Sequence, residues 1–173
     1  SKVVFDIETN GLDPTELWCI VAKSTTGEVK KFPPNKLKEG IEFLQSADTL
    51  IGHNIIGYDI PVLKKLTGIE LTNKVYDTLV VSRLANPARE NGHALKNWGF
   101  KLGYHKLEAP DSFDTYTPDM LKYCQQDVLL NELVYERLLL DTELFSNESI
   151  DLEHRVAVII QQQRDDGFAF DDK

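Results

Sequence analysis

Two carboxylates stand close together near the N-terminus, where a run of apolar residues ends. Asp6 and Glu8 are separated by one residue, so on a strand they project from the same face. At the end of a buried strand such a pair is costly, because the charges repel each other and lose hydration. A divalent cation removes both penalties. The alternative is a pair of solvated charges at a strand end, which is the commoner situation for an isolated pair.

A third carboxylate lies on the clearest helix of the sequence. Asp127 shares one helical stripe with Leu130 and Val134, which places it on the core-facing side. A buried, unpaired carboxylate is costly and needs a partner, which could be a cation or an ordinary Lys or Arg. Tyr123 lies one turn before Asp127, so its hydroxyl can reach whatever Asp127 binds. Alternatively, Tyr123 only packs and keeps its hydroxyl in water.

The segment 52–59 carries a fourth carboxylate and an amide between a strand and a helix. Asp59 lies where the helix begins, and Asn54 lies in the loop before it. Asp59 has an ordinary explanation as a helix N-cap or first-turn acid, and Asn54 as a turn residue. Taken alone, the segment supports these structural explanations as well as a role in binding.

These groups must be positioned by a sheet and its helices, and the spacing of apolar residues predicts both. Apolar runs bounded by turn residues predict strands at 3–8, 17–23, 28–32 and 49–52, and a strand that passes into a helix over 75–81. Amphipathic spacing predicts helices near 37–44, 58–66, 93–99, 117–140 and 150–166. Gly167 is expected to end the last helix. Hairpin-like links followed by alternating helices and strands indicate an α/β fold with a mixed sheet covered by helices.

Size and charge narrow the class of protein. The chain has 173 residues, 42% of them hydrophobic, which suffices for one domain with a buried core. Its 19 basic and 28 acidic residues give a formal net charge of −9, which argues against a protein that coats nucleic acid. An enzyme whose carboxylates hold cations remains compatible with this charge, because bound cations invert the local field and attract phosphate.

The remaining motifs indicate an intracellular protein. Cys19 and Cys124 cannot form a disulfide framework and are expected to be reduced core residues. No apolar run approaches the roughly 18–20 residues of a membrane span, and the start of the sequence has no signal-peptide pattern. We therefore expect a cytoplasmic protein that does not contact a membrane. The histidines show no ligand spacing and are expected to be structural or surface residues: His53, His93, His105 and His154.

Taken together, the carboxylate segments resemble the three motifs of the DEDD exonuclease superfamily. The matching residues are Asp6 to Thr9, Asn54 with Tyr58 and Asp59, and the segment from Tyr123 to Asp127. They occur in the order strand, loop to helix, and helix. The tyrosine four residues before the last aspartate is typical of the tyrosine subtype rather than the histidine subtype. The resemblance implies a ribonuclease H-like (DnaQ-like) fold, which is a mixed five-stranded sheet flanked by helices.

Further segments resemble the proofreading domain of T7-like phage family A DNA polymerases. They are 76–84, 93–99 and the tail from Asp151 to Asp171, and the stretch 103–119 is shorter than is usual for the family. The resemblance implies that 1–149 form a 3′→5′ exonuclease domain, and that 150–173 resemble the start of a link to a polymerase domain. The chain is then a fragment or a separately encoded proofreading subunit, in a bacterial or phage-infected cell.

The resemblance also implies roles for individual residues in a two-metal site. Two Mg²⁺ or Mn²⁺ ions about 3.5–4 Å apart would serve both ends of an in-line displacement at phosphorus. Asp6 is expected to bridge both ions, while Glu8 and Asp127 complete the shell of the first. Asp59 is expected to hold the second ion through water. Tyr123 is expected to orient the attacking water or help to deprotonate it.

The expected substrate is the 3′ end of DNA, preferentially single-stranded or frayed, because such a site contacts backbone and stacked bases rather than sequence. By the same resemblance, Thr9 and Leu12 should contact the terminal nucleotide, with Leu12 wedged between the last two bases. The alternative for Leu12 is a turn residue that packs on the core. Asn54 should bond near the scissile phosphate or sugar, and Tyr58 is a further substrate-binding candidate.

Two other functions and one partner remain to be weighed. A ribonuclease that trims RNA 3′ ends would carry the same motifs, and a catalytically silent docking module would keep the fold without the reaction. Only the resemblance of the flanking segments to phage polymerases favours DNA. The helix 150–166 carries more apolar surface than a terminal helix usually leaves exposed. We expect it to pack partly on this domain and partly on a DNA polymerase domain or subunit, or on another copy.

Overall fold

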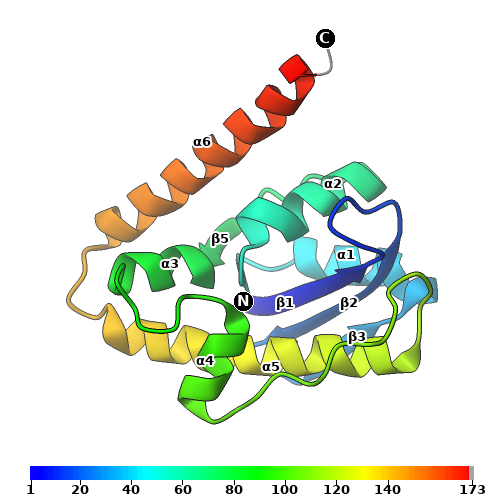
Figure 1. Ribbon diagram of the computed structural model, residues 1–173, viewed down its shortest axis with the longest axis horizontal. Coiled ribbons are helices and arrows are strands. Elements are labelled where there is room, and N and C mark those ends of the chain that lie inside the picture. Colours follow the sequence, from blue (N-terminus) through cyan, green and yellow to red (C-terminus); the bar gives the residue numbers. More distant parts are fainter. Residues whose placement is uncertain (172–173) are drawn as a thin grey trace.

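The fold is a five-stranded mixed sheet with helices on both faces (Figure 1). The structure is a computed structural model that describes the chain over residues 1–171 and its side chains over residues 1–166. The strands are β1 (Lys2–Thr9), β2 (Leu17–Ser24), β3 (Val29–Phe32), β4 (Thr49–Gly52) and β5 (Lys74–Asp77). Their order is β3-β2-β1-β4-β5, in which β1, β2 and β3 are antiparallel while β1, β4 and β5 are parallel. The predicted mixed sheet is confirmed.

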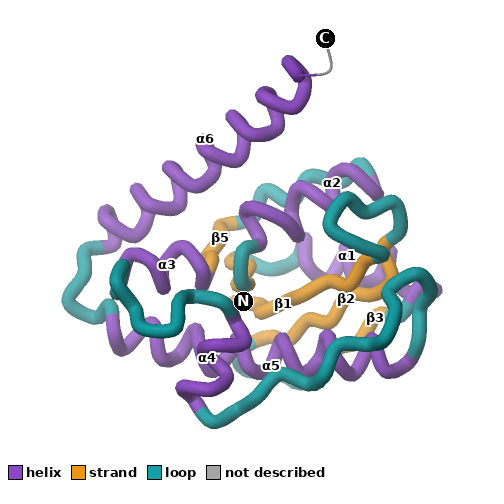
Figure 2. Tube along the Cα trace, in the orientation of Figure 1, coloured by secondary structure: helices purple, strands orange, loops and turns teal. Residues whose placement is uncertain are grey.

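Helices alternate with the later strands, as the tube in Figure 2 shows. They are α1 (Leu37–Gln45), α2 (Ile60–Thr67), α3 (Thr78–Ala85), α4 (Leu95–Leu102), α5 (Pro118–Asp141) and α6 (Asn147–Asp171), with a short helical turn at Pro34–Lys36. The predicted end of the last helix at Gly167 is wrong, because α6 continues to Asp171. Glycine inside a helix costs about 1 kcal/mol relative to alanine, which weakens the helix without ending it.

The alternation of β1 side chains decides which face carries the first two carboxylates. Val3 and Phe5 pack in the core that α1 and α2 cover, whereas Val4 packs with Cys124 and Val128 of α5 on the other face. Side chains two residues apart on a strand share a face. Asp6 and Glu8 continue the Val4 series and therefore point towards α5, the helix that carries the third carboxylate.

The parallel strands β1, β4 and β5 bring three loops to one edge of the sheet. Their carboxyl ends lie together because parallel strands run in the same direction, and ligands of α/β proteins bind at this edge. The chain leaves β4 through Asn54 towards α2, and it leaves β5 directly into α3 at Thr78. The segments predicted to carry chemistry therefore meet at one place.

The last helix lies against the edge strand β5 and then leaves the body of the fold (Figure 1). It begins at Asn147, three residues before the predicted start, and Ile150 packs against the core between α4 and α5. Several apolar side chains farther along α6 are exposed: Leu152, Val156, Val158, Ile159 and Ile160. The predicted packing on this domain is thus confirmed, while the division at 149/150 and a second packing partner stay predictions. Over the described residues, no helix is long and apolar enough to cross a membrane.

We expect α5 to be held mainly by its inward-facing leucines. Leu138 is fully buried, whereas Leu140, two residues later on the same helix, is 66% exposed. Replacing Leu138 by alanine should lower the free energy of unfolding by about 2–5 kcal/mol, because it removes buried surface and leaves a cavity. Leu140→Ala should change it by less than about 0.5 kcal/mol. Urea denaturation of both variants measures the difference, and equal losses would contradict this packing.

Candidate active site

Four carboxylates from three elements gather at the carboxyl edge of the parallel strands. Asp6 and Glu8 come from β1, Asp127 comes from α5, and Asp59 ends the π-helical turn η2 (Ile55–Asp59) that precedes α2. A pocket of about 220 Å³ lies between these elements, and Asp6, Asp59 and Asp127 line it. We call this the acidic pocket. The sequence predicted that these residues act together, and the fold brings them to one place.

Asp6 and Glu8 lie close enough to share a ligand. Their carboxylate oxygens and the Sγ atom of Cys124 all lie within 4.8 Å of one another, and the Cys124 thiol is 3.8 Å from Asp6 Oδ2. Burial, followed by the charge of Asp127, raises the pKa of Asp6 to about 7. Burial and the charge of Asp6 raise the pKa of Glu8 to about 10. Both pKa values are raised because the two carboxylates are buried next to other carboxylates without enough positive charge nearby.

Asp59 is presented by an unusual turn rather than by a helix cap. In η2 the backbone N–H of Ile60 bonds to the carbonyl of Ile55, one residue farther back than in an α-helix. The Asp59 side chain caps no backbone N–H, so the N-cap explanation is excluded. Asp59 is buried, its Oδ2 atom has no hydrogen-bond partner among the described residues, and burial with the charge of Asp6 raises its pKa well above the usual value.

Asp127 has one paired oxygen and one unpaired oxygen. The Lys106 ammonium lies 3.3 Å from Asp127 Oδ2, so the salt-bridge alternative is realised on this side. Oδ1 is buried without a partner among the described residues. Burial raises the pKa of Asp127 to about 6, although Lys106 opposes the shift. One lysine therefore does not neutralise the acidic pocket.

Lys106 was not predicted from the sequence. It lies in the loop between α4 and α5, where no periodicity indicates which way a side chain points. Its Nζ atom is 5.1 Å from the ring centroid of Tyr123. Burial alone would lower the pKa of Lys106, but the charge of Asp127 and the Tyr123 hydroxyl raise it overall. The sequence gave one indication of such a residue, because a buried Asp127 needs a positively charged partner, but it did not indicate which residue that is.

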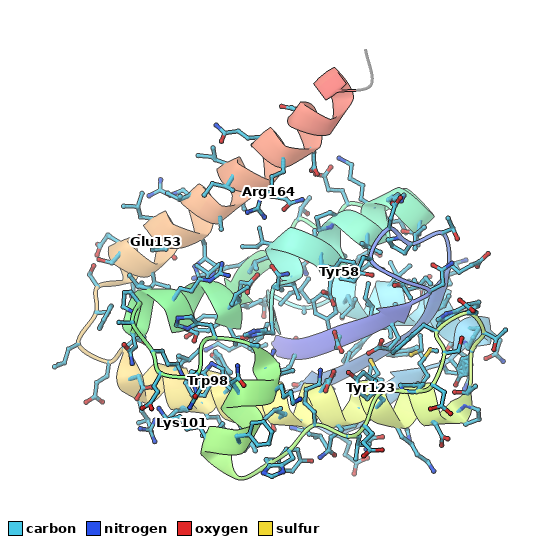
Figure 3. The ribbon with its side chains drawn as sticks, in the orientation of Figure 1. Tyr58, Trp98, Lys101, Tyr123, Glu153 and Arg164 are labelled. Carbon is cyan, nitrogen blue, oxygen red and sulfur yellow. The ribbon has the colours of Figure 1, made fainter. Side chains whose placement is uncertain are left out.

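The two predicted tyrosines enclose the site. Tyr58 from η2 and Tyr123 from α5 lie on opposite sides of β1 (Figure 3). Burial raises the pKa of Tyr123, and Lys106 opposes this shift, so the phenol keeps its proton near neutral pH. Its place one turn before Asp127 on α5 agrees with the predicted helix.

Thr9 and Tyr58 hold the turn that follows β1. The Thr9 Oγ1 and Tyr58 hydroxyl oxygens are 2.6 Å apart, and both hydroxyls reach the carbonyl oxygen of Gly11, at 3.0 Å and 2.7 Å. The next residue, Leu12, is 95% exposed. The alternative in which Leu12 packs on the core is therefore excluded, and a fixed turn presents this leucine to solvent.

Asn54 sits in a left-handed conformation that a second aspartate stabilises. Its φ is 60°, a region that asparagine tolerates better than most residues. The Asn54 N–H donates to Asp77 Oδ1 at 2.8 Å, and the Ile56 N–H donates to Asp77 Oδ2 at 3.0 Å. Asp77 is fully buried at the end of β5 and also accepts from the Leu79 N–H at 3.0 Å. Sequence reasoning missed Asp77, although an aspartate between a strand and a helix is a common N-cap signal.

A second network ties α5 to the ends of β4 and β5. The Thr78 hydroxyl donates to Asn131 Oδ1 at 2.8 Å, and His53 Nδ1 lies 2.9 Å from the same hydroxyl oxygen. Asn131 is one turn after Asp127 on α5, so this bond fixes that helix relative to the loop after β4. Burial lowers the pKa of His53 to about 4, which keeps its ring neutral. This histidine is structural, as expected.

The fold belongs to a known class. A mixed five-stranded sheet flanked by helices in this order is a ribonuclease H-like fold, which the structural neighbours of this chain share. Over 97% of its length the chain superposes on NrnC from Brucella melitensis with bound Mg²⁺, at a TM-score of 0.75 and 20% identity, covering 87% of that chain. It also superposes on the exoribonuclease RNase D of Escherichia coli at a TM-score of 0.69 and 16% identity, covering 93% of this chain and 45% of that one.

The sequence is similar to one particular group of proteins. It is 27% identical to the DNA-directed DNA polymerase of Escherichia phage T7, in an alignment that is 236 residues long and covers 99% of this chain. The chain spans 34% of the length of that polymerase. No protein-family model matches. The resemblance to phage polymerases expected from the motifs is thus confirmed.

The metal-free protein should become less stable as pH rises. The raised pKa values of Asp6 and Glu8 mean that the folded chain holds protons that the unfolded chain releases near pH 4. This stabilisation is present at low pH and is lost as pH rises through the folded pKa values. From pH 7 to pH 9 in EDTA, we expect a loss on the order of 1–3 kcal/mol, measured by urea denaturation.

The double variant Asp6→Asn/Glu8→Gln is the control for this pH dependence. It keeps the side-chain shapes but cannot ionise at these two positions, so the part of the pH dependence that comes from Asp6 and Glu8 should be absent over the same interval. His53 does not affect this interval, because its pKa is lowered to about 4 by burial. Its contribution makes the folded protein more stable as pH rises, but only below pH 7. A wild-type protein whose stability is flat from pH 7 to pH 9 would contradict the raised pKa values.

Proposed function

We propose that this chain is a 3′→5′ exonuclease that hydrolyses DNA from the 3′ end by a two-metal-ion mechanism. The observation that carries the proposal is the acidic pocket, in which Asp59 and Asp127 each keep one buried oxygen without a partner among the described residues. Buried carboxylates with raised pKa values need positive charge, and one lysine does not supply enough. Similarity to the phage polymerase over 99% of the chain favours DNA as the substrate.

The residues fit two divalent cations. Carboxylate oxygens are hard ligands that suit Mg²⁺ or Mn²⁺, whereas the Cys124 thiol is a poor ligand for either ion. Asp6 would bridge both ions, with Glu8 and Asp127 on the first. Asp59 would hold the second, through water. Bound ions would supply Lewis-acid stabilisation of the attacking and leaving oxygens of the phosphodiester. NrnC, which has this fold, has been found with bound Mg²⁺.

The surrounding side chains of the chain would orient the substrate and a water molecule. The Tyr123 phenol, which burial keeps protonated, would hold the attacking water at hydrogen-bond distance. Leu12, fully exposed on a turn that Thr9 and Tyr58 fix, would wedge between the last two bases. Asn54, on the rim of the acidic pocket, would bond to the scissile phosphate or the adjoining sugar.

Removal of nucleotides from RNA 3′ ends is the second candidate. The same fold is found in RNase D, an exoribonuclease involved in structured RNA processing, and in NrnC bound to pGG, at a TM-score of 0.67. A ribose 2′-hydroxyl distinguishes the two substrates through local contacts near the terminal nucleotide. We place DNA first because the sequence similarity to a DNA polymerase covers 99% of the chain at 27% identity, whereas NrnC with bound Mg²⁺ is 20% identical and RNase D is 16% identical.

The same similarity supports proposals about partners and location. Residues 1–149 would form the nuclease unit, and 150–173 would begin the link to a DNA polymerase domain or subunit, for which the exposed apolar side chains of α6 offer a surface. Proofreading would then place the protein with the replication machinery in the cytoplasm of a bacterial or phage-infected cell. The substrate would be a frayed or single-stranded 3′ end.

A labelled oligonucleotide tests the reaction directly. With Mg²⁺ or Mn²⁺, a 5′-labelled DNA strand should shorten as a ladder and a 3′-labelled strand should release mononucleotides, while EDTA should stop both. Asp127→Asn keeps the shape of the side chain but removes a charged ligand, so it should lower the rate by at least roughly 100-fold. Asp119→Asn, on the exposed first turn of the same helix, should leave the rate unchanged.

The same assay separates the competing functions. An RNA strand of the same sequence that is cleaved much faster than DNA would transfer the proposal to the ribonuclease. Binding of single-stranded DNA without cleavage, with either metal ion, would instead indicate a docking module. Cleavage that survives Asp127→Asn would show that the acidic pocket is not the active site.

Lys106 should compete with cations for the acidic pocket. Its ammonium occupies one side of Asp127, so Lys106→Met should tighten Mn²⁺ binding by at least roughly tenfold, through the loss of one nearby positive charge. Electron paramagnetic resonance of free Mn²⁺ measures the affinity. Lys122→Met, an exposed lysine on α5, is the matched control and should change the affinity little. Unchanged or weaker binding in Lys106→Met would refute this competition.

A further inference from the structure

Helix α6 carries a histidine that is hydrogen-bonded to the sheet edge. His154 Nε2 lies 2.9 Å from the backbone N–H of Asp77, and Nδ1 lies 2.7 Å from the carbonyl oxygen of Ile150, one turn back on α6. A backbone N–H can only donate, so Nε2 accepts and the ring proton resides on Nδ1, which donates to Ile150. The His154 ring also lies against Tyr76 of β5, with 5.9 Å between centroids. Glu153, labelled in Figure 3, marks this part of α6.

The bonded N–H belongs to a strand with a free edge. β5 pairs with β4 on one side and is the last strand of the sheet on the other. An edge strand leaves N–H groups without sheet partners, and one that is also covered needs another acceptor. His154 supplies that acceptor at Asp77, the residue where β5 ends and α3 begins.

The side chain of the same residue holds the loop that enters the acidic pocket. Asp77 accepts the N–H groups of Asn54 and Ile56, and these residues begin the turn that ends at Asp59. The left-handed backbone of Asn54 is strained and persists only where its surroundings hold it. Close packing adds a second restraint, because a Cβ at Gly57 would lie 2.4 Å from the Asn54 Oδ1 atom. Asp77 therefore connects α6 to the geometry of η2.

We propose that His154 and Asp77 are positioning residues, which set the Asn54–Asp59 segment so that Asp59 faces the acidic pocket only when α6 is docked. The proposal rests on the function proposed above, since it assigns Asp59 a role in catalysis. The coupling runs through three hydrogen bonds, and neither His154 nor Asp77 belongs to the substrate and metal contacts proposed above. A binding partner that moved α6 away from β5 would therefore lower the nuclease activity without touching the active site.

Substitutions at His154 test the coupling. His154→Leu keeps the approximate size of the ring but removes the acceptor, whereas His154→Gln can place Oε1 where Nε2 was. Arg155→Ala, at an exposed neighbouring position, is the control. We expect His154→Leu to lower kcat on a DNA oligonucleotide by about 10–100-fold, as is typical for partners of metal ligands, with KM within about twofold. His154→Gln should restore most of the activity.

Amide hydrogen exchange supplies a measurement that requires neither metal nor turnover. In His154→Leu, the Asn54 and Ile56 amides should exchange faster relative to amides of β2, whereas Arg155→Ala and His154→Gln should resemble the wild type. Asp77→Asn, which leaves at least one of the three N–H donors without an acceptor, should produce the same local change and serves if His154→Leu does not fold.

The outcomes separate this proposal from the function it builds on. If His154→Leu loses global stability alone, with normal kcat for the folded protein and unchanged relative exchange at Asn54 and Ile56, the positioning role is overturned. If the wild type cleaves no nucleic acid, the proposed function fails, but the exchange rates still decide whether α6 controls the loop. Faster local exchange restored by glutamine supports the coupling in either situation.

Discussion

The rest of the structure depends on one unfavourable interaction, the crowding of carboxylates at the end of β1. Burial and mutual repulsion raise the pKa values of Asp6, Glu8, Asp59 and Asp127, so each of them is held in a place where its charge is poorly tolerated. A protein keeps such an arrangement only where the surrounding structure over-determines it. Lys106 supplies partial compensation, and the unpaired oxygens show how much remains.

The fold meets this constraint by drawing the carboxylates from different elements. Strand alternation sends Asp6 and Glu8 towards α5, while hydrogen bonds from Thr78 to Asn131 fix α5 against the ends of β4 and β5. Each acidic group is therefore anchored by packing or bonding at a distance from its charge. The packing of the whole sheet and its helices therefore opposes the repulsion between the carboxylates. As a result, the four acidic side chains stay close together in the folded protein.

Much of this arrangement could be predicted from the sequence because it depends on local periodicity. Alternation places Asp6 and Glu8 on one face, and helical spacing turns Asp127 inward, so three of the four carboxylates follow from patterns within single elements. The strands and helices are bounded by turn residues and Pro-containing caps in the same way. Asp59 was less certain, because an acid at the start of a helix has an ordinary capping explanation, which is excluded only by the missing side-chain cap bond in the structure.

The parts that the sequence did not reveal depend on contacts between distant segments. Lys106 reaches Asp127 from a loop without periodicity, and Asp77 and His154 meet through one hydrogen bond across 77 positions. His154 was expected to be a structural or surface residue, and its spacing gave no sign of which backbone group it would contact. The exposure of Leu12 was undecidable in the same way, because it is set by hydroxyl bonds from Thr9 and Tyr58.

The π-helical turn before α2 has a consequence for how this chain can vary. Its closing bond from Ile60 to Ile55 includes one residue more than an α-helical turn, and Asp59 falls inside the ring. Removing a single residue would rotate Asp59 by about 100° relative to Asp6, because each residue of a helix turns the chain by that amount. A change in the length of this turn would therefore turn Asp59 away from Asp6 even if every other side chain of the stretch were kept.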